Sequence, residues 1–298
     1  MRILITGGKG FIGTRLVKAL ANVHSESDSR IPLQHNITTY DLVDGQDIRN
    51  MHDLDKAFEY AQPQTVIHLA ARTGVRRSID YPGEYITTNI EGTWNVGAMC
   101  QKHGARLISF STASVFGNEP PPIPEYAEKR PISLYGMTKL IGEHIVDNLS
   151  IPTVIVRPFN VYGGNGRGDQ VFFKWINQLK TGRLATIYDT PESCRGYTYV
   201  ADITEIVAKL AGMEWNWKDH QDFNIGGSEI IMLDDLVQIF SDNIAEFASR
   251  SIRIPAPKED IVANYACIDK AREIIGFNPP PRFQENLISI IEKELIYA

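Results

Sequence analysis

The feature that most constrains how this chain can fold is a glycine-rich turn near its beginning. A β-branched run at residues 2–6 indicates a buried strand, and the apolar spacing from Phe11 onward indicates an amphipathic helix. The turn between them fits both Gly-x-Gly-x-x-Gly and Gly-x-x-Gly-x-x-Gly through Gly7, Gly8, Gly10 and Gly13. A backbone without side chains lets a pyrophosphate approach closely, and the start of a helix offers it unpaired N–H groups. Strand, turn and helix together predict a nucleotide-binding site, with an ordinary tight turn as the alternative.

Strand-like and helix-like segments alternate as far as about residue 158. This pattern is typical of an α/β fold with a Rossmann-type doubly wound parallel sheet and helices on both faces. After residue 158 the elements are shorter and mixed. We therefore expect a nucleotide-binding domain at residues 1–158 and a smaller mixed α/β substrate domain at 159–298, interleaved because residues 199–226 return to the sheet. Ligands of open parallel sheets bind at the carboxyl ends of the strands, so the cleft between the two domains is the expected site.

Composition narrows the class of protein. The chain has 298 residues and a formal net charge of −6, which gives no electrostatic reason to expect nucleic acid or an anionic membrane as a partner. Its three cysteines have no tight spacing, which argues against a disulfide framework and a metal site and for a reducing compartment. No run of about 20 apolar residues is present, and four glycines interrupt the first apolar stretch, unlike a signal peptide. We expect a soluble cytoplasmic protein without a metal.

Asp41 follows the second strand-like run, residues 37–40. A carboxylate at the end of this strand can accept hydrogen bonds from both hydroxyls of an adenosine ribose and repels a 2′-phosphate, which favours NAD over NADP. Asp41 lies 28 residues beyond Gly13, whereas the usual interval is about 20. An enlarged loop explains the extra length, and the segment before Asp47 also lacks one expected strand. A solvated turn aspartate is the alternative.

Tyr135 and Lys139 stand at i and i+4 of a helix-like segment and therefore on the same face. A phenol with a pKa near ~10 is a poor base at neutral pH, but a nearby ammonium and a positively charged nicotinamide favour the phenolate. The pair is thus a physically reasonable general base for a sugar hydroxyl. Hydroxyls at the end of the preceding strand, Thr112 among them, can relay the proton or simply cap the strand. His68 lies within a buried apolar run, and we expect it to be a core residue.

Five segments resemble, in the same order, the extended short-chain dehydrogenase/reductases, and more narrowly the nucleotide-sugar epimerases and dehydratases: residues 6–13, 68–71, 111–117, 135–139 and 157–163. The resemblance is strongest to the UDP-sugar 4-epimerases and runs from Met1 to about Pro279. It implies NAD as a resident cofactor. It also implies a homodimer in which the helices at residues 82–103 and 135–149 pair across a two-fold axis as a four-helix bundle.

The resemblance implies cofactor contacts in and near these segments. The glycine turn, with the amides of Phe11 and Ile12, would hold the pyrophosphate. Asp41 would bind the adenosine ribose and Lys139 the second ribose, and Asn89 begins the Asn-x-x-Gly-Thr motif of the family. The full implied set is Gly7, Gly10, Phe11, Ile12, Gly13, Asp41, Asp47, Ile48, Leu69, Ala70, Ala71, Asn89, Tyr135 and Lys139.

The same resemblance implies three catalytic residues: Tyr135 as the base, Lys139 as its partner and Thr112 as the hydroxyl relay. It implies substrate contacts for Arg76, Thr112, Ser114, Tyr135, Asn160, Arg167 and Arg195. Among these, Arg195 matches an arginine that contacts the diphosphate, a task that suits a bidentate guanidinium. The second diphosphate arginine of the family has no clear counterpart here, which leaves Lys258 and Arg253 as candidates.

The residues after Thr112 indicate the reaction. Sugar dehydratases of this family carry Asp-Glu there, and related decarboxylases carry Glu two places on, whereas this chain has Ala113 and Ser114. Without a carboxylate for water loss, we expect NAD-dependent C4 epimerisation of a nucleotide-diphosphate sugar through a transient 4-keto intermediate. A nucleotide-linked keto-sugar reductase or dehydrogenase is one alternative. A non-catalytic NAD-binding regulator is another, which the Tyr-x-x-x-Lys pair disfavours.

The sugar itself is less constrained. The asparagine at position 160 resembles the residue that enzymes acting on neutral hexoses carry at this place, which favours UDP-hexose or UDP-N-acetylhexosamine as the substrate. Arg76 and Arg167 lie in segments that resemble uronic-acid epimerases, whose added arginines suit a sugar carboxylate. UDP-uronate 4-epimerase is therefore the alternative, although each of these two arginines can also be merely exposed.

Overall fold

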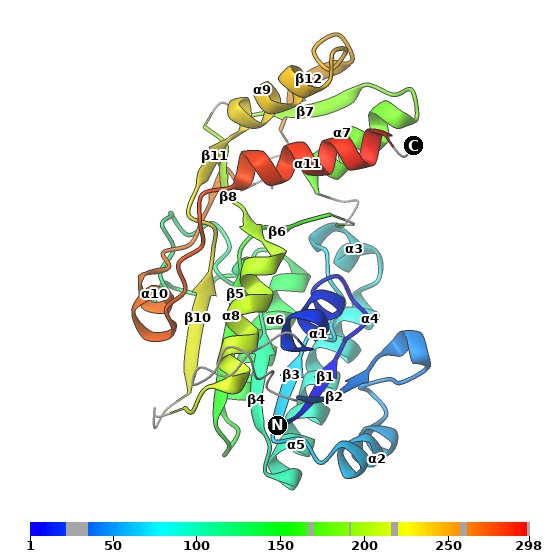
Figure 1. The fold of residues 1–298 in the computed structure, drawn as a ribbon, viewed down its shortest axis with the longest axis vertical. Coiled ribbons are helices and arrows are strands. Elements are labelled where there is room, and N and C mark those ends of the chain that lie inside the picture. Colours follow the sequence, from blue (N-terminus) through cyan, green and yellow to red (C-terminus); the bar gives the residue numbers. More distant parts are fainter. Residues whose placement is uncertain are drawn as a thin grey trace.

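Six parallel strands form the central sheet of the protein (Figure 1). The computed structural model describes residues 1–21, 35–164, 166, 170–190, 192–215, 220–256 and 261–296. The order of the strands is β10-β5-β4-β3-β1-β2, and every neighbouring pair is parallel. The strands are β1 (Arg2–Thr6), β2 (Asn36–Tyr40), β3 (Thr65–His68), β4 (Arg106–Phe110), β5 (Thr153–Pro158) and β10 (Gln221–Ile225). The prediction of a Rossmann-type doubly wound parallel sheet is confirmed.

Alternating side chains of the strands build two cores, one on each face of the sheet. Ile3 and Ile5 of β1 pack with α1 (Gly13–Ala21), and α8 (Val200–Gly212) lies beside α1 on the same face. Leu4 packs on the opposite face, because neighbouring residues of a strand point to opposite sides. The helices of this second layer are α2 (Met51–Ala61), α5 (Gly92–His103) and α6 (Leu134–Asp147).

The helical stretch predicted at residues 82–103 is present, and it contains a π-helical segment. Helix α4 (Pro82–Ile86) continues through the π-helical residues Thr87–Glu91 into α5, and Gly104 caps α5 with φ 67°. Asn89, in the middle, is fully buried; its side chain accepts a hydrogen bond from the Arg72 N–H at 2.8 Å and donates one to the Arg72 oxygen at 3.0 Å. The π-helical turn thus anchors the connection that follows β3.

Strand β2 forms one edge of the sheet, and among the described residues no further strand lies between it and α2. It leads through the short turn Leu42–Asp44 directly to residues 47–50 and α2. This agrees with the expectation that the segment before Asp47 lacks one strand. Asp41 therefore follows the edge strand, next to the glycine turn.

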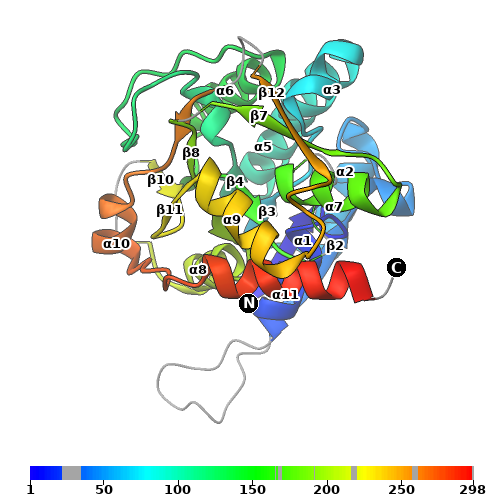
Figure 2. The ribbon, with the colours of Figure 1, turned by 90° about the horizontal axis from the view of Figure 1, so that it is seen from above.

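A second group of elements covers the carboxyl ends of the central strands (Figures 1 and 2). Its core is rich in aromatic side chains, and Phe172, Trp175, Phe240 and Phe247 are fully buried there. Strands β7 and β12 pair in parallel. The elements of this group are α7 (Val171–Lys180), β7 (Ala185–Asp189), α9 (Leu233–Asn243), β12 (Ser251–Pro255) and α11 (Phe283–Ile296).

Short strands join the two groups of elements. They are β6 (Val161–Tyr162), which pairs with β9 (Thr198–Tyr199), and β8 (Cys194–Gly196), which lies between β11 (Ile230–Met232) and β13 (Ala263–Asn264). After β9 the chain returns to the central sheet as α8 and β10, while the limits of the two domains stay a prediction.

Two short helices complete the fold: α3 (Val75–Asp80), which has no clear sequence signal, and α10 (Asp269–Ile275). In the described part of the chain, every helix is too short or too polar to cross a membrane.

Candidate active site

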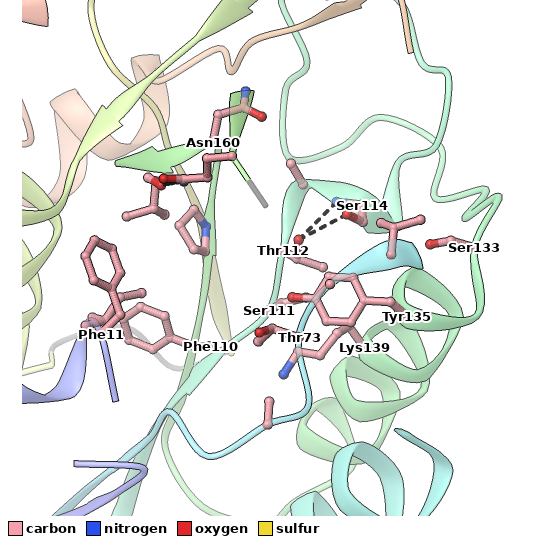
Figure 3. Close-up of a pocket in the computed structure, with 18 of the residues that line it drawn as sticks. Phe11, Thr73, Phe110, Ser111, Thr112, Ser114, Ser133, Tyr135, Lys139 and Asn160 are labelled. Atoms are coloured by element: carbon pink, nitrogen blue, oxygen red, sulfur yellow. Dashed lines mark hydrogen bonds between the residues drawn. The ribbon is translucent and has the colours of Figure 1, made fainter. Parts of the chain in front are cut away.

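A cavity of about 690 Å³ lies at the carboxyl ends of the central strands, against the glycine turn (Figure 3). Of the residues predicted from the sequence, those that line it are Gly7, Gly10, Phe11, Ile12, Gly13, Leu69, Ala71, Arg76, Thr112, Ser114, Tyr135, Lys139, Asn160 and Arg195. Tyr135, Lys139 and Thr112 lie on one side, and Phe11 and Phe110 lie on the other (Figure 3). The fold thus brings most of the predicted site residues to one place, while their individual roles stay predictions.

Close backbone contacts shape the glycine turn and exclude side chains from it. Gly7 has φ 73°, and a Cβ there would lie 2.6 Å from the Ala70 nitrogen. A Cβ on Gly13 would lie 2.3 Å from the Gly7 oxygen. Both distances are far below van der Waals contact, so these two positions need glycine. The turn packs against the end of β3 and starts α1 at the cavity wall, an arrangement that fits the pyrophosphate of NAD.

Asp41 connects the glycine turn to the segment after β2. Its Oδ2 accepts a hydrogen bond from the Lys9 N–H at 2.8 Å, and its Oδ1 accepts one from the Val43 N–H at 3.0 Å. The residue is buried and is not part of the cavity lining. A carboxylate held by two amides beside the glycine turn suits the ribose role, which stays a prediction.

Four other residues implied for the cofactor do not line the cavity: Asp47, Ile48, Ala70 and Asn89. Arg49 forms a forked ion pair with Asp47, with Nη2 2.5 Å from Oδ2, and this hydrogen bonding lowers the pKa of Asp47. Ile48 is a buried core residue. The Asn89 Nδ2 also donates to the Thr138 Oγ1 at 3.0 Å, which joins the π-helical turn to α6. Direct cofactor contacts of these four residues stay predictions.

Helix α6 carries Tyr135 and Lys139 into the cavity. The Ser133 hydroxyl caps its first turn by accepting a hydrogen bond from the Gly136 N–H at 3.1 Å. Tyr135 is 9% exposed and Lys139 is 6% exposed. Burial lowers the pKa of Lys139 to about 8, and the charge of Glu143 opposes this shift. A phenol and a desolvated ammonium on one helix face can hold and transfer a proton.

Thr112 and Ser114 stand next to α6, at the end of β4 (Figure 3). The Thr112 Oγ1 donates to the Ser114 Oγ at 3.3 Å and accepts from the Ser114 N–H at 3.2 Å. Thr112 therefore caps the turn Ala113–Val115 and also lines the cavity, so the cap and the relay are compatible. Gly136 permits the close approach, since a Cβ there would lie 2.5 Å from the Ser114 oxygen. Sequence reasoning missed Gly136, whose only signal is a glycine in the first turn of a helix.

Asn160 ties the loop after β5 to the second group of elements. Its backbone has φ 40°, which is uncommon for a residue other than glycine. Its Nδ2 donates to the Gly196 oxygen, the Asn264 backbone oxygen and the Asn264 Oδ1, each at 3.1 Å. Asn264 also lines the cavity, and nothing in the sequence pattern indicates this contribution.

Arg195 lines the cavity from β8, where backbone carbonyls hold its guanidinium. Its Nη1 donates to the Val262 oxygen at 2.7 Å, and its Nη2 donates to the Ile261 oxygen. Arg253, one candidate for the second diphosphate contact, is not part of the lining and pairs with Asp234 at 2.6 Å. Two other predicted residues lie outside the described part of the chain: Arg167 and Lys258.

Arg76 lines the cavity, and its guanidinium lies near Tyr188 of β7. Its guanidinium lies 5.9 Å from the centre of the Tyr188 ring, and the Lys174 Nζ lies 4.7 Å from the same centre. Hydrogen bonding from Arg76 and the charge of Lys174 lower the pKa of Tyr188. Arg76 therefore reaches across to the second group of elements. No motif marks Lys174 or Tyr188, which sequence reasoning missed.

His68 is a core residue, as predicted, and is 1% exposed. Its Nδ1 lies 2.7 Å from the Thr6 Oγ1, and its Nε2 lies 3.1 Å from the Thr93 Oγ1. Thr93 donates its own proton to the Asn89 oxygen at 2.7 Å, so it accepts the Nε2 proton of His68. Burial lowers the pKa of His68 to about 3. The ring is therefore neutral and structural, and the prediction is confirmed.

Comparison with known proteins identifies the family. The model of the NAD-dependent epimerase/dehydratase family matches residues 3–226. The chain belongs to this family. It is 30% identical to Protein CapI of Staphylococcus aureus over 100% of this chain and 99% of that protein. It is 28% identical to a probable UDP-glucuronate 4-epimerase of Rhizobium meliloti over 98% of this chain and 96% of that protein.

Two solved structures of epimerases are similar over almost the whole chain. UDP-glucuronic acid 4-epimerase from Bacillus cereus, in complex with UDP-glucuronic acid and NAD, has a TM-score of 0.83 and 27% identity, covering 98% of this chain and 99% of that chain. UDP-glucose 4-epimerase from Thermotoga maritima, with UDP-glucose, has a TM-score of 0.83 and 26% identity, covering 99% of this chain and 100% of that chain. Membership of the epimerase/dehydratase family confirms the predicted family and its dependence on NAD.

The cavity of this epimerase/dehydratase has a cationic lining. Among its described lining residues, Arg76, Lys139 and Arg195 are basic, and none is Asp, Glu or His. The described residues also contain no group of three His, Cys, Asp or Glu side chains placed to hold a metal. A cleft lined by cations suits an anionic ligand, and the described part of its lining offers no carboxylate for acid catalysis.

Proposed function

We propose that this chain catalyses NAD-dependent epimerisation at C4 of a nucleotide-diphosphate sugar, with UDP-hexose or UDP-N-acetylhexosamine as substrate, through a transient 4-keto sugar. One observation carries the proposal: Tyr135, Lys139 and Thr112 meet at one cavity beside the glycine turn, and no described lining residue is a carboxylate. Ala113 and Ser114 form the wall where a dehydratase carries its acids. Solved relatives described as UDP-sugar 4-epimerases support the same reaction.

The chain's own residues account for the proton transfers. NAD, when bound along the glycine turn, supplies a hydride acceptor that is also the hydride donor. Tyr135, as the phenolate, takes the proton of the C4 hydroxyl, and Thr112 hydrogen-bonds to that oxygen. Lys139 stabilises the phenolate, since an ammonium is most effective where water is excluded. Inversion at C4 requires the keto sugar to present its other face, so the sugar turns within the cavity before Tyr135 returns the proton.

UDP-uronate is the second candidate substrate, and Arg76 is the observation that favours it. Arg76 lines the cavity, where a guanidinium can pair with a sugar carboxylate. A relative from Rhizobium meliloti is a probable UDP-glucuronate 4-epimerase, and the similar structure from Bacillus cereus is that of a UDP-glucuronic acid 4-epimerase. Arg195, held by two carbonyls, is our proposed contact for the diphosphate of either substrate.

The experiment is incubation of the purified protein with UDP-glucose, UDP-N-acetylglucosamine and UDP-glucuronate separately, followed by NMR of the sugar. We expect the C4 epimer of at least one of them without added NAD(H), because the cofactor is regenerated in each cycle. If the protein carries no bound NAD(H) and instead consumes added NAD(P)H stoichiometrically, it is a keto-sugar reductase and the epimerase proposal is wrong.

We also propose a homodimer formed through α5 and α6, which pack against each other. Trp94 of α5 is 53% exposed, and Met137 and Ile141 of α6 are 49% and 38% exposed. Large apolar side chains exposed on neighbouring helices are typical of an interaction surface. We likewise propose that the chain divides into two domains at residue 158 and that the protein is cytoplasmic.

A further inference from the structure

A buried ion pair lies one helical turn beyond Lys139. Arg157 of β5 is 0% exposed and Glu143 of α6 is 3% exposed. The Arg157 Nε donates to the Glu143 Oε1 at 2.7 Å, and its Nη2 donates to the Glu143 Oε2 at 2.9 Å. The two side chains form a forked pair in which both carboxylate oxygens are occupied. Neither residue lines the cavity or takes part in the proposed proton transfers.

The pair is the centre of a longer chain of charges through the sheet. The Lys129 Nζ lies 3.0 Å from the Glu143 Oε2, and the Arg157 Nη1 lies 2.7 Å from the Asp222 Oδ2 of β10. Asp222 in turn binds Lys270 of α10 at 2.6 Å. The chain connects α6 to two strands and to a helix near the C-terminal end. The buried charges of Arg157 and Glu143, at the centre of this network, remain tolerable only while they keep their partners.

Glu143 and Lys139 are i and i+4 neighbours on α6, so the carboxylate lies on the same helix face as the ammonium. With no other partner, a buried carboxylate in this position would pair with Lys139. Arg157 and Lys129 occupy its oxygens instead. Consequently Lys139 presents its ammonium to the cavity.

We propose that Arg157 is a positioning residue for the catalytic helix: by holding both oxygens of Glu143 it keeps that carboxylate off Lys139 and sets the net charge that Lys139 experiences. This inference rests on the proposed function for its catalytic meaning, but the geometry it describes is independent of the substrate. Burial lowers the pKa of Lys139, whereas the negative charge of Glu143 raises that pKa. The positive charge of Arg157 must therefore act on the pKa of Lys139 in the direction opposite to Glu143.

All charged and titratable groups near the Arg157–Glu143 pair contribute to the net charge that Lys139 experiences. Those facing Lys139 and Glu143 are Tyr135 and Asp147 on α6, His68 on β3, Lys129 in the loop before α6, and Arg157, which itself contacts Asp222. His68 is neutral, because burial lowers its pKa to about 3, so it adds no charge. Removing Arg157 therefore leaves the site more negative, and removing the charge of Glu143 leaves it more positive.

The test measures the pKa of Lys139 directly, by competitive acetylation of its amine as a function of pH with readout by peptide mass spectrometry. In Arg157→Met the pKa of Lys139 should rise, and in Glu143→Gln it should fall, each by about one unit, which is about tenfold in labelling rate at fixed pH. The double variant should return close to the wild-type value. Arg157→Lys, which keeps the charge and loses the fork, should raise the pKa of Lys139 less than Arg157→Met does, because the charge is kept but the two oxygens of Glu143 are no longer both held.

Opposite shifts with cancellation separate positioning from mere stability, because loss of packing would not order the variants by charge. Arg106→Met is the matched control. Arg106 is a half-buried arginine at the first residue of β4, whereas the cavity lies beyond the last residue of that strand. Its replacement should leave the pKa of Lys139 unchanged. If Arg157→Met does not fold, the pKa of Lys139 in Glu143→Gln and in the double variant still tests the inference, because it should fall in the first and return close to the wild-type value in the second. Shifts in the same direction, or no shift, overturn the inference. An inactive wild type would refute the proposed function alone, because acetylation needs no turnover.

When the protein is active, the pH profile of kcat provides a second readout. Its alkaline limb, where Lys139 loses its proton, should move up in Arg157→Met and down in Glu143→Gln, while KM changes less than kcat. An alkaline limb that stays in place in both variants would contradict the coupling.

Discussion

Replacing Lys139 by Met is expected to stabilise the protein at neutral pH while it removes activity. Lys139 is 6% exposed, and burial lowers its pKa from 10.5 to about 8. Each pKa unit corresponds to about 1.4 kcal/mol, so keeping this ammonium buried and charged costs about 3 kcal/mol of folding free energy. Met has a similar length and no charge, and the site loses this penalty with little change in volume.

The sign of the pH dependence follows from the protons bound in each state. Below pH 8 Lys139 is protonated in both the folded and the unfolded chain, and the full penalty is present. Between pH 8 and 10.5 the unfolded chain binds more protons, so the stability of the wild type rises with pH relative to the variant. At pH 9.5 the advantage of Lys139→Met should have fallen to about 1.4 kcal/mol.

The assay is urea unfolding of both proteins at pH 7 and pH 9.5, monitored by fluorescence. Lys56→Met is the control, because Lys56 lies on the exposed face of α2 with 62% of its side chain accessible. The difference in stability between Lys56→Met and the wild type should be the same at both pH values, because both proteins keep Lys139. The reasoning is refuted when Lys139→Met is less stable than the wild type at pH 7, or when its advantage is the same at both pH values.

Three further changes test separate parts of the proposal. Tyr135→Phe should lower kcat by about 10²- to 10⁴-fold, the contribution of a general base, with bound NAD(H) and the unfolding midpoint retained; normal turnover would exclude Tyr135 as the base. Gly13→Ala places a Cβ 2.3 Å from the Gly7 oxygen, so the purified protein should contain little NAD(H) by absorbance and chromatography, and full cofactor content would contradict the cradle. Trp94→Glu should convert a dimer to a monomer in light scattering, and an unchanged mass would move the interface elsewhere.

The sheet and the glycine turn could be predicted because their signals are local. Residues 2–6 form a strand and Gly13 starts a helix through interactions within a few positions, and the positive φ angle of Gly7 already favours glycine before its contact with Ala70 is considered. Tyr135 and Lys139 share a face for the same reason, since α6 imposes the i and i+4 relation. Short-range rules are sufficient for features of this kind.

The remaining parts of the site depend on contacts between distant segments. Asn264 is held at the cavity by a hydrogen bond that its Oδ1 accepts from the Nδ2 of Asn160, 104 residues earlier in the chain. No sequence pattern in either segment predicts this contact. Tyr188 meets Arg76 only after β7 folds over the first group of elements. Asn89 shows the reverse case: its motif is visible in the sequence, but the π-helical turn directs its side chain to Arg72 and not to the cavity.

The two candidate substrates differ in one charge, the carboxylate of the uronate sugar. The lining of the cavity indicates which residue would bind this carboxylate. The net charge of −6 describes the whole surface, whereas a ligand in a cleft responds to charges within about 8–10 Å. Arg195 is fixed by carbonyls and suits the diphosphate that both substrates carry. Arg76→Met should therefore raise KM for UDP-glucuronate by about tenfold, the effect of losing an ion pair of about 1.4 kcal/mol, and leave KM for UDP-glucose nearly unchanged. Equal effects on both substrates would show that Arg76 does not read the sugar carboxylate and would remove the reason for favouring a uronate.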